Sequence, residues 1–306
     1  MLLSKRVIFV ILVVVILVSV VGYYLYSSYQ TPKLERYANP QLLVDGDWVL
    51  NHSADSHVRV VDIRSPDDYA KGHVKNAVNL KFENLRVTVD GITNVAPKDV
   101  VELTFGELGF TPEFTVVIYD KGDNLDAALV FWTLEYYGHK DARILNGGWS
   151  RWVDNGSPMT SEVPTFEKTI YRATIQPELL ATAEYILENL QNRKVALVDA
   201  RSPSEYNGTD VRAKRAGHIP GAVNIEWRRN LNPDGTFKSA SELSKMYDQL
   251  GVTKDKEVIT YCQTGHRAAN TYFTLRLLGS HLTRSFSSES KKSRYFSYSR
   301  RNIIGM

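Results

Sequence analysis

The residue of this chain best suited to nucleophilic chemistry is Cys262, the only thiol among 306 residues. A short apolar run, residues 258–261, comes directly before it and is typical of a buried strand. Residues 262–267 then read Cys-Gln-Thr-Gly-His-Arg and lead into an Ala-rich segment with helical spacing. A loop between a strand end and a helix start collects backbone N–H groups that bind anions and stabilise a thiolate. We therefore predict that Cys262 is the catalytic nucleophile.

The rest of this loop supplies candidate substrate-binding residues. Gly265 allows the backbone a conformation that side chains would forbid, and His266 and Arg267 add positive charge. The candidates within the loop are Gln263, Thr264, Gly265, His266 and Arg267.

Composition narrows the remaining possibilities. Apolar residues make up 43% and charged residues 23% of the chain, which is ordinary globular usage. A single cysteine excludes an internal disulfide framework and a Cys-rich zinc site. The net charge of +3 is too small to indicate nucleic acid binding. We predict no metal, no cofactor and no nucleic-acid partner.

The chain carries an internal duplication at an offset of about 140 residues, far longer than the period of a solenoid repeat. The first copy contains residues 60–66, Tyr69, Gly72-His73 and Ala77-Val78-Asn79. The second contains residues 197–203, Tyr206, Gly217-His218 and Ala222-Val223-Asn224, with an extra basic loop at 208–216. At the position of Cys262, the first copy has Asp120.

Each copy reads as alternating strands and helices, which predicts a wrapped and mostly parallel sheet. In the second copy, residues 195–198 and 258–261 are predicted strands, and residues 241–250 and 268–278 have helical spacing. The predicted organisation is a membrane anchor at 1–29, a non-catalytic domain at 37–157, a linker at 158–174, a catalytic domain at 175–279 and an atypical basic, Ser-rich tail at 280–306.

These motifs resemble the tandem-domain sulfurtransferases of the rhodanese family over residues 41–279. The resemblance rests on residues 199–206 (Asp-Ala-Arg-Ser-Pro-Ser-Glu-Tyr), residues 217–224 (Gly-His-Ile-Pro-Gly-Ala-Val-Asn), the loop 262–267, and Gly147-Gly148-Trp149. It implies two rhodanese-like α/β domains, of which the second is catalytic. Asp120 in place of a cysteine fits an inactive first domain.

The resemblance also implies a double-displacement reaction. Cys262 takes a sulfur from a donor such as thiosulfate, and cyanide or a thiol then removes it from the persulfide. Arg201 matches the family position that faces the anionic group of the donor, and a guanidinium binds an oxyanion bidentately. The structural alternative is that Arg201 pairs with Asp199 or Glu205, as its twin Arg64 suggests. The charge of the loop favours thiosulfate over 3-mercaptopyruvate, although the loop matches neither group of family members closely.

Two other functions of the site are alternatives. The first is a cysteine phosphatase, but those enzymes use Cys-x5-Arg, whereas Arg267 follows Cys262 with only four residues between them. A non-catalytic binding module is the other alternative, with its active domain damaged by the altered C-terminus.

The N-terminus predicts a membrane segment. Lys5 and Arg6 precede an apolar run, residues 7–21, which Tyr23 and its neighbours extend. Twenty helical residues span about 30 Å, the thickness of a bilayer core. The basic pair predicts a cytoplasmic N-terminus, so both domains would be extracytoplasmic, either periplasmic or extracellular. A cleaved signal peptide and a buried core helix are the alternatives.

The C-terminus departs from the duplication. Residues 280–306 contain eight serines, six basic residues and one acidic residue, so this segment carries +5 and the rest of the chain −2. It has no counterpart of residues 144–152 of the first copy, which contain Trp149 and Trp152. We therefore expect the second domain to lack its last strand. A frameshift product, an unrelated replacement and a natural basic tail are the three explanations considered.

Overall fold

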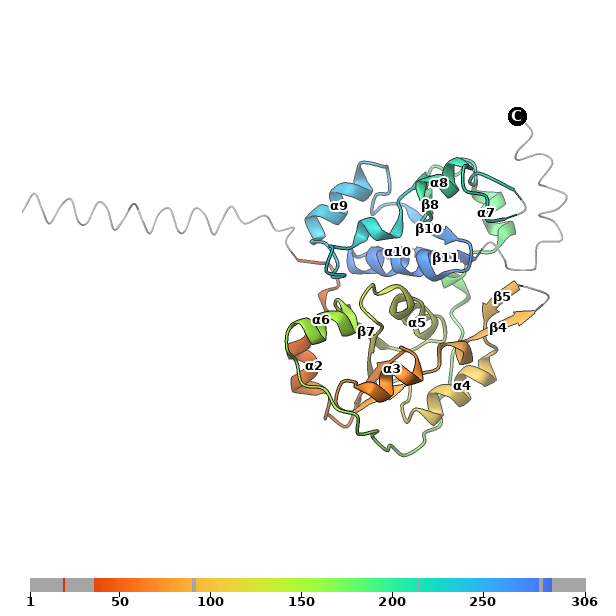
Figure 1. The fold of residues 1–306 in the computed structure, drawn as a ribbon. Coiled ribbons are helices and arrows are strands. Elements are labelled where there is room, and N and C mark those ends of the chain that lie inside the picture. Colours follow the sequence, from red (N-terminus) through yellow and green to blue (C-terminus); the bar gives the residue numbers. More distant parts are fainter. Residues whose placement is uncertain (1–18, 20–35, 90–91, 214, 281–282, 288–306) are drawn as a thin grey trace, which may run out of the picture.

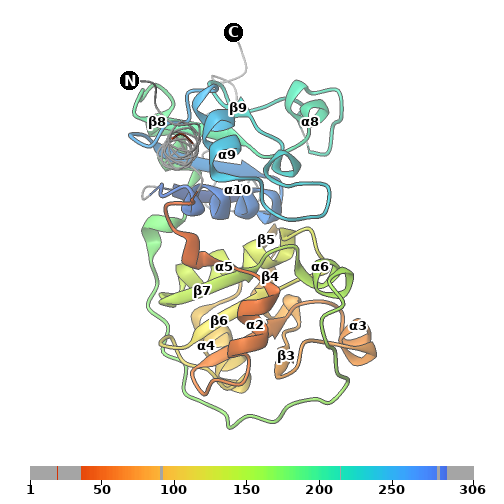
Figure 2. The ribbon, with the colours of Figure 1, turned by 90° about the vertical axis from the view of Figure 1, so that its left-hand side faces the viewer.

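The computed structural model describes residues 19, 36–89, 92–213, 215–280 and 283–287. The described residues form two α/β domains that stack on each other, the first in orange to green and the second in teal to blue (Figure 1). Each domain contains a sheet of parallel strands. Helices α5 (Leu125–Tyr136) and α10 (His266–Leu277) lie between the two domains (Figures 1 and 2).

The sheet of the first domain has the strand order β1-β7-β6-β2-β3, with every neighbouring pair parallel. Its strands are β1 (Leu43–Val44), β2 (Val58–Asp62), β3 (Ala77–Asn79), β6 (Thr115–Tyr119) and β7 (Asp141–Leu145). An antiparallel hairpin projects from this domain and consists of β4 (Arg86–Val89) and β5 (Ile92–Val95) (Figure 1). Beside α5, the helices are η1 (Pro40–Leu42), α2 (Gly46–His52), α3 (Pro66–Lys71), η2 (Phe82–Leu85), α4 (Lys98–Glu107) and α6 (Gly148–Asp154).

The sheet of the second domain has the order β11-β10-β8-β9 and is also parallel throughout. Its strands are β8 (Val195–Asp199), β9 (Val223–Asn224), β10 (Glu257–Cys262) and β11 (Thr283–Ser287). Beside α10, the helices are η3 (Pro177–Leu179), α7 (Ala183–Asn189), α8 (Pro203–Asn207), η4 (Trp227–Asn230) and α9 (Ala240–Asp248). Residues 161–176, all of them described, form neither helix nor strand and connect the two domains (Figure 2).

The predicted strands and helices of the second copy are confirmed as β8, β10, α9 and α10. Strand β10 is buried from Val258 to Cys262 because helices and the other domain cover both faces of its sheet. The Ser-Pro pair of each copy begins a helix in the same way. Ser65 and Ser202 cap α3 and α8 with their hydroxyls, and the following proline takes a position that needs no N–H donor.

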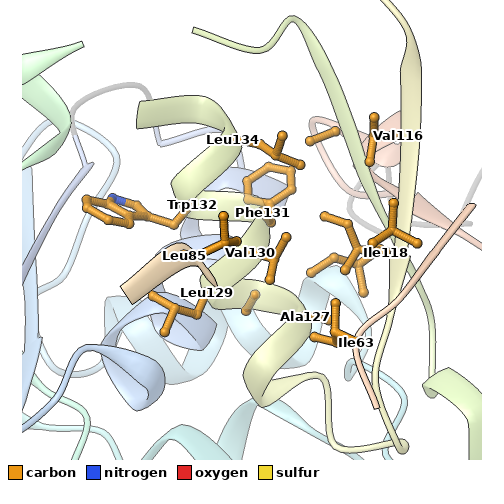
Figure 3. Close-up of a cluster of buried hydrophobic side chains, with 14 of the residues drawn as sticks. Ile63, Leu85, Val116, Ile118, Ala127, Leu129, Val130, Phe131, Trp132 and Leu134 are labelled. Carbon is orange, nitrogen blue, oxygen red and sulfur yellow. The ribbon is translucent and has the colours of Figure 1, made fainter. Parts of the chain in front are cut away.

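The two domains share one hydrophobic core, which forms around α5 and α10. Figure 3 shows that α5 contributes side chains to this core from two faces. Ala127 and Phe131 point toward Ile118 of β6. Leu129 and Trp132 point the opposite way. On the α10 side, the Phe273 ring lies 4.8 Å from that of Phe131, edge to face. A core that crosses the domain boundary fixes α10 against the first domain.

The structure corrects the expected loss of the last strand. Residues 283–287 form β11, which pairs in parallel with all but the first residue of β10. Thr283 and Ser285 are buried in it, and the Ser285 carbonyl accepts the backbone N–H of Ala181 at 3.0 Å. Backbone pairing needs no particular side chain, so a Ser/Thr-rich segment can replace an apolar strand. No counterpart of Trp149 follows β11, because the sequence has no tryptophan after Trp227.

The predicted anchor, residues 1–29, lies outside the described residues except for Ser19. Within the part of the chain that the structure describes, no helix has both the length and the apolar character needed to cross a bilayer.

Candidate active site

Cys262 is the last residue of β10, and a tight loop leads from it into α10. Only 1% of the residue is exposed. The backbone N–H groups of Gly265 and Ala268 both donate to its Sγ atom, at 3.1 and 3.4 Å. Donors aimed at one atom stabilise a negative charge on it. The structure thus places the sulfur in a cradle of backbone N–H groups, as the sequence predicts.

The cradle depends on the backbone conformation of Gly265. This residue precedes the first turn of α10 and has a φ of +97°, in the region that glycine favours. A Cβ atom built there would come no closer than 3.8 Å to its nearest neighbour, the Arg86 Nη1 atom. Space is therefore available, and the backbone conformation alone calls for glycine.

Arg267 brings positive charge to the sulfur. The two groups lie in the same loop, and the charge of Arg267 interacts favourably with Cys262. The other partner of Arg267 is Glu205 of α8: Nη1 donates to Oε2 and Nη2 donates to Oε1, the latter at 3.1 Å. Burial opposes the charge of Arg267, but the hydrogen bonds and charges of Glu205 and Cys262 raise its pKa further above its ordinary value. Arg267 is therefore a fixed cation beside the nucleophile.

Gln263 and Thr264 connect the loop to its surroundings. The Gln263 Nε2 atom donates to the Arg212 carbonyl oxygen at 2.9 Å, in the extra loop of the second copy. The Thr264 carbonyl oxygen accepts from Nη2 of Arg86 at 2.8 Å, so the first domain also supports the catalytic loop. These contacts fix the loop to the second domain's basic loop and to the first domain.

His266 differs from its expected role as a source of positive charge. Burial, reinforced by the charges of Arg86 and Arg267, lowers the pKa of its imidazole to about 4. The ring Nδ1 lies 3.2 Å from the Thr264 hydroxyl and the ring packs against Phe82, with centroids 5.2 Å apart. At neutral pH, His266 is therefore neutral, and the charge of the loop comes from Arg267.

Arg201, the predicted contact of the donor's anionic group, makes hydrogen bonds within its own domain. Its Nε and Nη2 atoms donate to the buried carboxylate of Asp199, with Nη2 to Oδ2 at 2.6 Å, and Nη2 also donates to the Gly217 carbonyl oxygen. In the first domain, Arg64 makes the same contacts with Asp62 and the Gly72 carbonyl oxygen. Of the two partners that the sequence offered to Arg201, Asp199 is the one found.

Two residues that support the loop were not predicted as site residues. Glu205 entered only as an alternative partner of Arg201, and Arg86 was given no part. Glu205 lies in the first turn of a helix, where acidic residues are common without any site. Arg86 is far from the loop in sequence and belongs to the other domain. Neither residue carries a signal that a single sequence could reveal.

The matching loop of the first domain holds a carboxylate where the second holds sulfur. Asp120 is 2% exposed and follows β6 directly. Its Oδ1 atom accepts the backbone N–H groups of Gly122 and Asn124, at 2.8 and 3.1 Å, and Oδ2 accepts that of Ala127 at 3.3 Å. The same kind of cradle is thus occupied by the side chain of its own domain.

A cavity of about 320 Å³ borders the catalytic loop at the domain interface. Its wall includes Thr264 and Gly265 of the loop, the Arg86 side chain, and the rings of Trp132 and Tyr136. Among the described residues, no group of three or more His, Cys, Asp or Glu side chains is placed to hold a metal ion.

Comparison with known proteins identifies the class. The family model of the rhodanese-like domain matches residues 45–155 and 182–288, so both halves of the chain are covered. The chain belongs to the rhodanese family and is a tandem-domain sulfurtransferase of the thiosulfate and 3-mercaptopyruvate sulfurtransferase type. The second match includes the residues of β11, in agreement with the strand that the structure shows.

Individual relatives agree with this class. The sulfur carrier protein TtuD of Thermus thermophilus is 39% identical over 259 residues, which cover 79% of this chain and 89% of that protein. The thiosulfate sulfurtransferase of Pseudomonas aeruginosa is 37% identical over 221 residues, covering 72% and 82%. Among solved structures, SseA of Escherichia coli superimposes with a TM-score of 0.72 at 24% identity, covering 82% of this chain and 99% of that one, which shows the shared fold.

Proposed function

We propose that this protein moves a sulfane sulfur from thiosulfate to cyanide or a thiol through a persulfide on Cys262. The observation that carries the proposal is the Sγ atom of Cys262, which receives two backbone N–H donors and interacts favourably with the charge of Arg267. The names of relatives such as the Pseudomonas aeruginosa thiosulfate sulfurtransferase support this donor.

The first half-reaction forms the persulfide. The Cys262 thiolate attacks the outer sulfur of thiosulfate, the new S–S bond forms, and the bond to the sulfonate sulfur breaks with its electron pair, so that sulfite leaves. The N–H groups of Gly265 and Ala268 then face an anionic sulfur chain instead of a thiolate. In the second half-reaction, cyanide attacks the terminal sulfur, thiocyanate leaves, and the thiolate returns.

The charge around the loop supports thiosulfate over 3-mercaptopyruvate as donor. Arg267 is a permanent cation at the sulfur, and a dianionic donor gains more from it than a monoanionic carboxylate does. His266, neutral at neutral pH, adds nothing to this preference. Mercaptopyruvate turnover by the same cysteine is the second candidate, because SseA, which shares this fold, is described as a 3-mercaptopyruvate sulfotransferase.

The test is thiosulfate:cyanide sulfurtransferase activity of the full chain, together with its intact mass after thiosulfate alone. We expect the mass to increase by one sulfur atom and thiocyanate to appear once cyanide is added. The Cys262→Ser variant should show neither. No mass increase in folded protein with thiosulfate, but an increase with 3-mercaptopyruvate, would reassign the donor. An increase with neither would contradict the persulfide mechanism.

We further propose that residues 1–29 anchor the protein in a membrane by a single helix, with both domains extracytoplasmic. The support is the apolar run 7–21 that follows Lys5 and Arg6. Membrane fractionation of the full chain, compared with a variant that begins at Gln30, tests the anchor. Protease protection of the domains in cells whose outer envelope has been removed, with the inner membrane intact, would contradict the proposed orientation.

A further inference from the structure

The duplication gives an internal control for the role of each residue, because both copies build the same fold and only one holds a nucleophile. Contacts present in both copies are explained by the fold alone. The Tyr119 and Tyr261 hydroxyls, for example, accept the backbone N–H of Val74 and Ile219, respectively, at 3.2 and 3.1 Å. A buried polar contact found only beside Cys262 needs another explanation.

The pair of Glu205 and Arg267 is such a contact. At the position of Glu205, the first copy has Asp68, which is exposed on α3 and pairs with Lys71 of its own helix at 3.0 Å. The first copy has no arginine in its loop from Asp120 to Ala127. The ion pair therefore occurs with the nucleophile and not with the repeated fold.

Glu205 binds the Arg267 guanidinium with both of its carboxylate oxygens, a two-pronged contact called the clamp below. The residue is 2% exposed, and its two carboxylate oxygens each accept from a different Nη atom of Arg267. Burial opposes ionisation of Glu205, but the hydrogen bonds and charge of Arg267 lower its pKa to about 2. Glu205 is therefore a carboxylate at every pH at which the protein works, and the clamp is permanent.

We propose that Glu205 is a positioning residue of the sulfur-transfer site, which orients Arg267 so that its charge faces the Cys262 sulfur and the anionic donor. The inference rests on the proposed function and deepens it. It assigns recognition of the donor anion to Arg267 and not to Arg201, whose hydrogen bonds go to Asp199 and Gly217.

The first experiment compares alkylation of Cys262 by iodoacetate, an anion, with alkylation by neutral iodoacetamide, in the full chain. The thiolate fraction affects both reagents alike, so the ratio of the two rate constants reports the positive charge at the sulfur. Glu205→Gln keeps one acceptor oxygen but turns an amide N–H₂ toward Arg267, which breaks the two-pronged contact. We expect the iodoacetate-to-iodoacetamide ratio to fall at least about fivefold.

The matched control is Asp68→Asn, the same exchange in the non-catalytic copy, which should leave the ratio unchanged. An unchanged ratio in folded Glu205→Gln protein would show that Glu205 serves stability only. A ratio that rises would show that Glu205 only neutralises Arg267 and does not orient it. Either result would overturn the proposal.

The second experiment measures steady-state turnover with thiosulfate. An anion-binding role predicts that KM for thiosulfate rises about tenfold in Glu205→Gln while kcat changes less. If the alkylation ratio falls but KM does not change, Arg267 faces the sulfur without binding this donor. That outcome would leave the positioning role intact and contradict thiosulfate as the ligand of Arg267.

A second variant covers the case in which Glu205→Gln does not fold. Arg267→Lys retains the charge and Glu205 but cannot form the forked contact. We expect the same fall in the alkylation ratio, because the ammonium group is no longer held at the sulfur. A wild-type ratio in this variant would overturn the proposal, since it would show that orientation of the charge is not needed.

Discussion

The two loops that follow β6 and β10 both place backbone N–H donors around one side chain, but that side chain differs between them. Both collect backbone N–H groups between a parallel strand and a helix, and both aim them at the side chain that ends the strand. In the first loop, the carboxylate of Asp120 satisfies those donors permanently. In the second, the sulfur of Cys262 receives the donors, and in the proposed reaction it also gains and loses a sulfur atom.

The two loops share the arrangement of backbone N–H donors but differ in the groups around it. Burial and the charge of Asp123 raise the pKa of Asp120 to about 6, although the N–H groups of Gly122 and Ala127 oppose this shift. The first loop thus contains its own, imperfectly stabilised anion. The second differs by its nucleophile and by the added cation Arg267, with Glu205 behind it.

The largest expected effect comes from removing the nucleophile. Cys262→Ser should reduce sulfurtransferase activity by at least about a thousandfold, because a hydroxyl forms no persulfide. Thermal unfolding should be nearly unchanged, since the two side chains are similar in size. Asp120→Ser is the matched variant, and it should retain activity. Thiocyanate release measures both, and comparable losses would show that the loops do not differ in function as proposed.

The next effect tests the repeated arginines. Arg64→Leu and Arg201→Leu each leave a fully buried aspartate without its ion-pair partner, Asp62 or Asp199, which should cost about 3 kcal/mol of unfolding free energy in each case. Chemical denaturation measures both. A rise in KM for thiosulfate confined to Arg201→Leu would show that Arg201 contacts the donor and is more than a part of the fold.

A smaller effect concerns the pH dependence of stability. The pKa of Asp120 is raised from its ordinary 3.8 to about 6 in the folded protein. Its contribution to stability is therefore complete at low pH and is lost as the pH rises through about 6. Asp120→Asn removes this loss, so its unfolding free energy relative to wild type should increase by about 2 kcal/mol between pH 4 and pH 7.

Urea denaturation across that pH range tests the Asp120 prediction. The control is Asp68→Asn, which changes an exposed carboxylate of the same domain. If the difference in unfolding free energy between Asp120→Asn and wild type were the same at pH 4 and pH 7, burial would not disfavour the ionised form of Asp120.

The smallest effect is conformational. Gly265→Ala places a Cβ at φ +97°, where space is available but the backbone is unfavourable, so stability should fall by about 1 kcal/mol. Activity should fall as well, because the N–H groups of Gly265 and Ala268 lose their aim at Sγ. The comparison is Asn124→Gly, where the first loop has φ +52° and glycine is easily accommodated. Loss of stability but not of activity in Gly265→Ala would separate the loop conformation from catalysis.

The sequence by itself determined the place of the one thiol in a strand–loop–helix segment, the duplication and the order of strands and helices. Each of these depends on local features: one thiol, a repeated motif, and apolar runs that end at polar loops. A strand, a tight loop and a helix in succession bring N–H groups to Cys262 through neighbouring residues, so the cradle could be predicted without knowledge of the rest of the fold.

Only the tertiary structure decided which charges face that sulfur. The sequence offered Arg201 as the first candidate for the donor anion and Arg267 as the second. In the structure, Asp199 holds Arg201, while Glu205, distant in sequence, holds Arg267. His266 lost its expected charge because the first domain buries it. Strand β11 likewise formed from an unpromising Ser/Thr-rich segment because β10 offered an unpaired edge. Ion pairs, burial and strand edges depend on residues far apart in the chain, and their juxtaposition exists only once the two domains are packed.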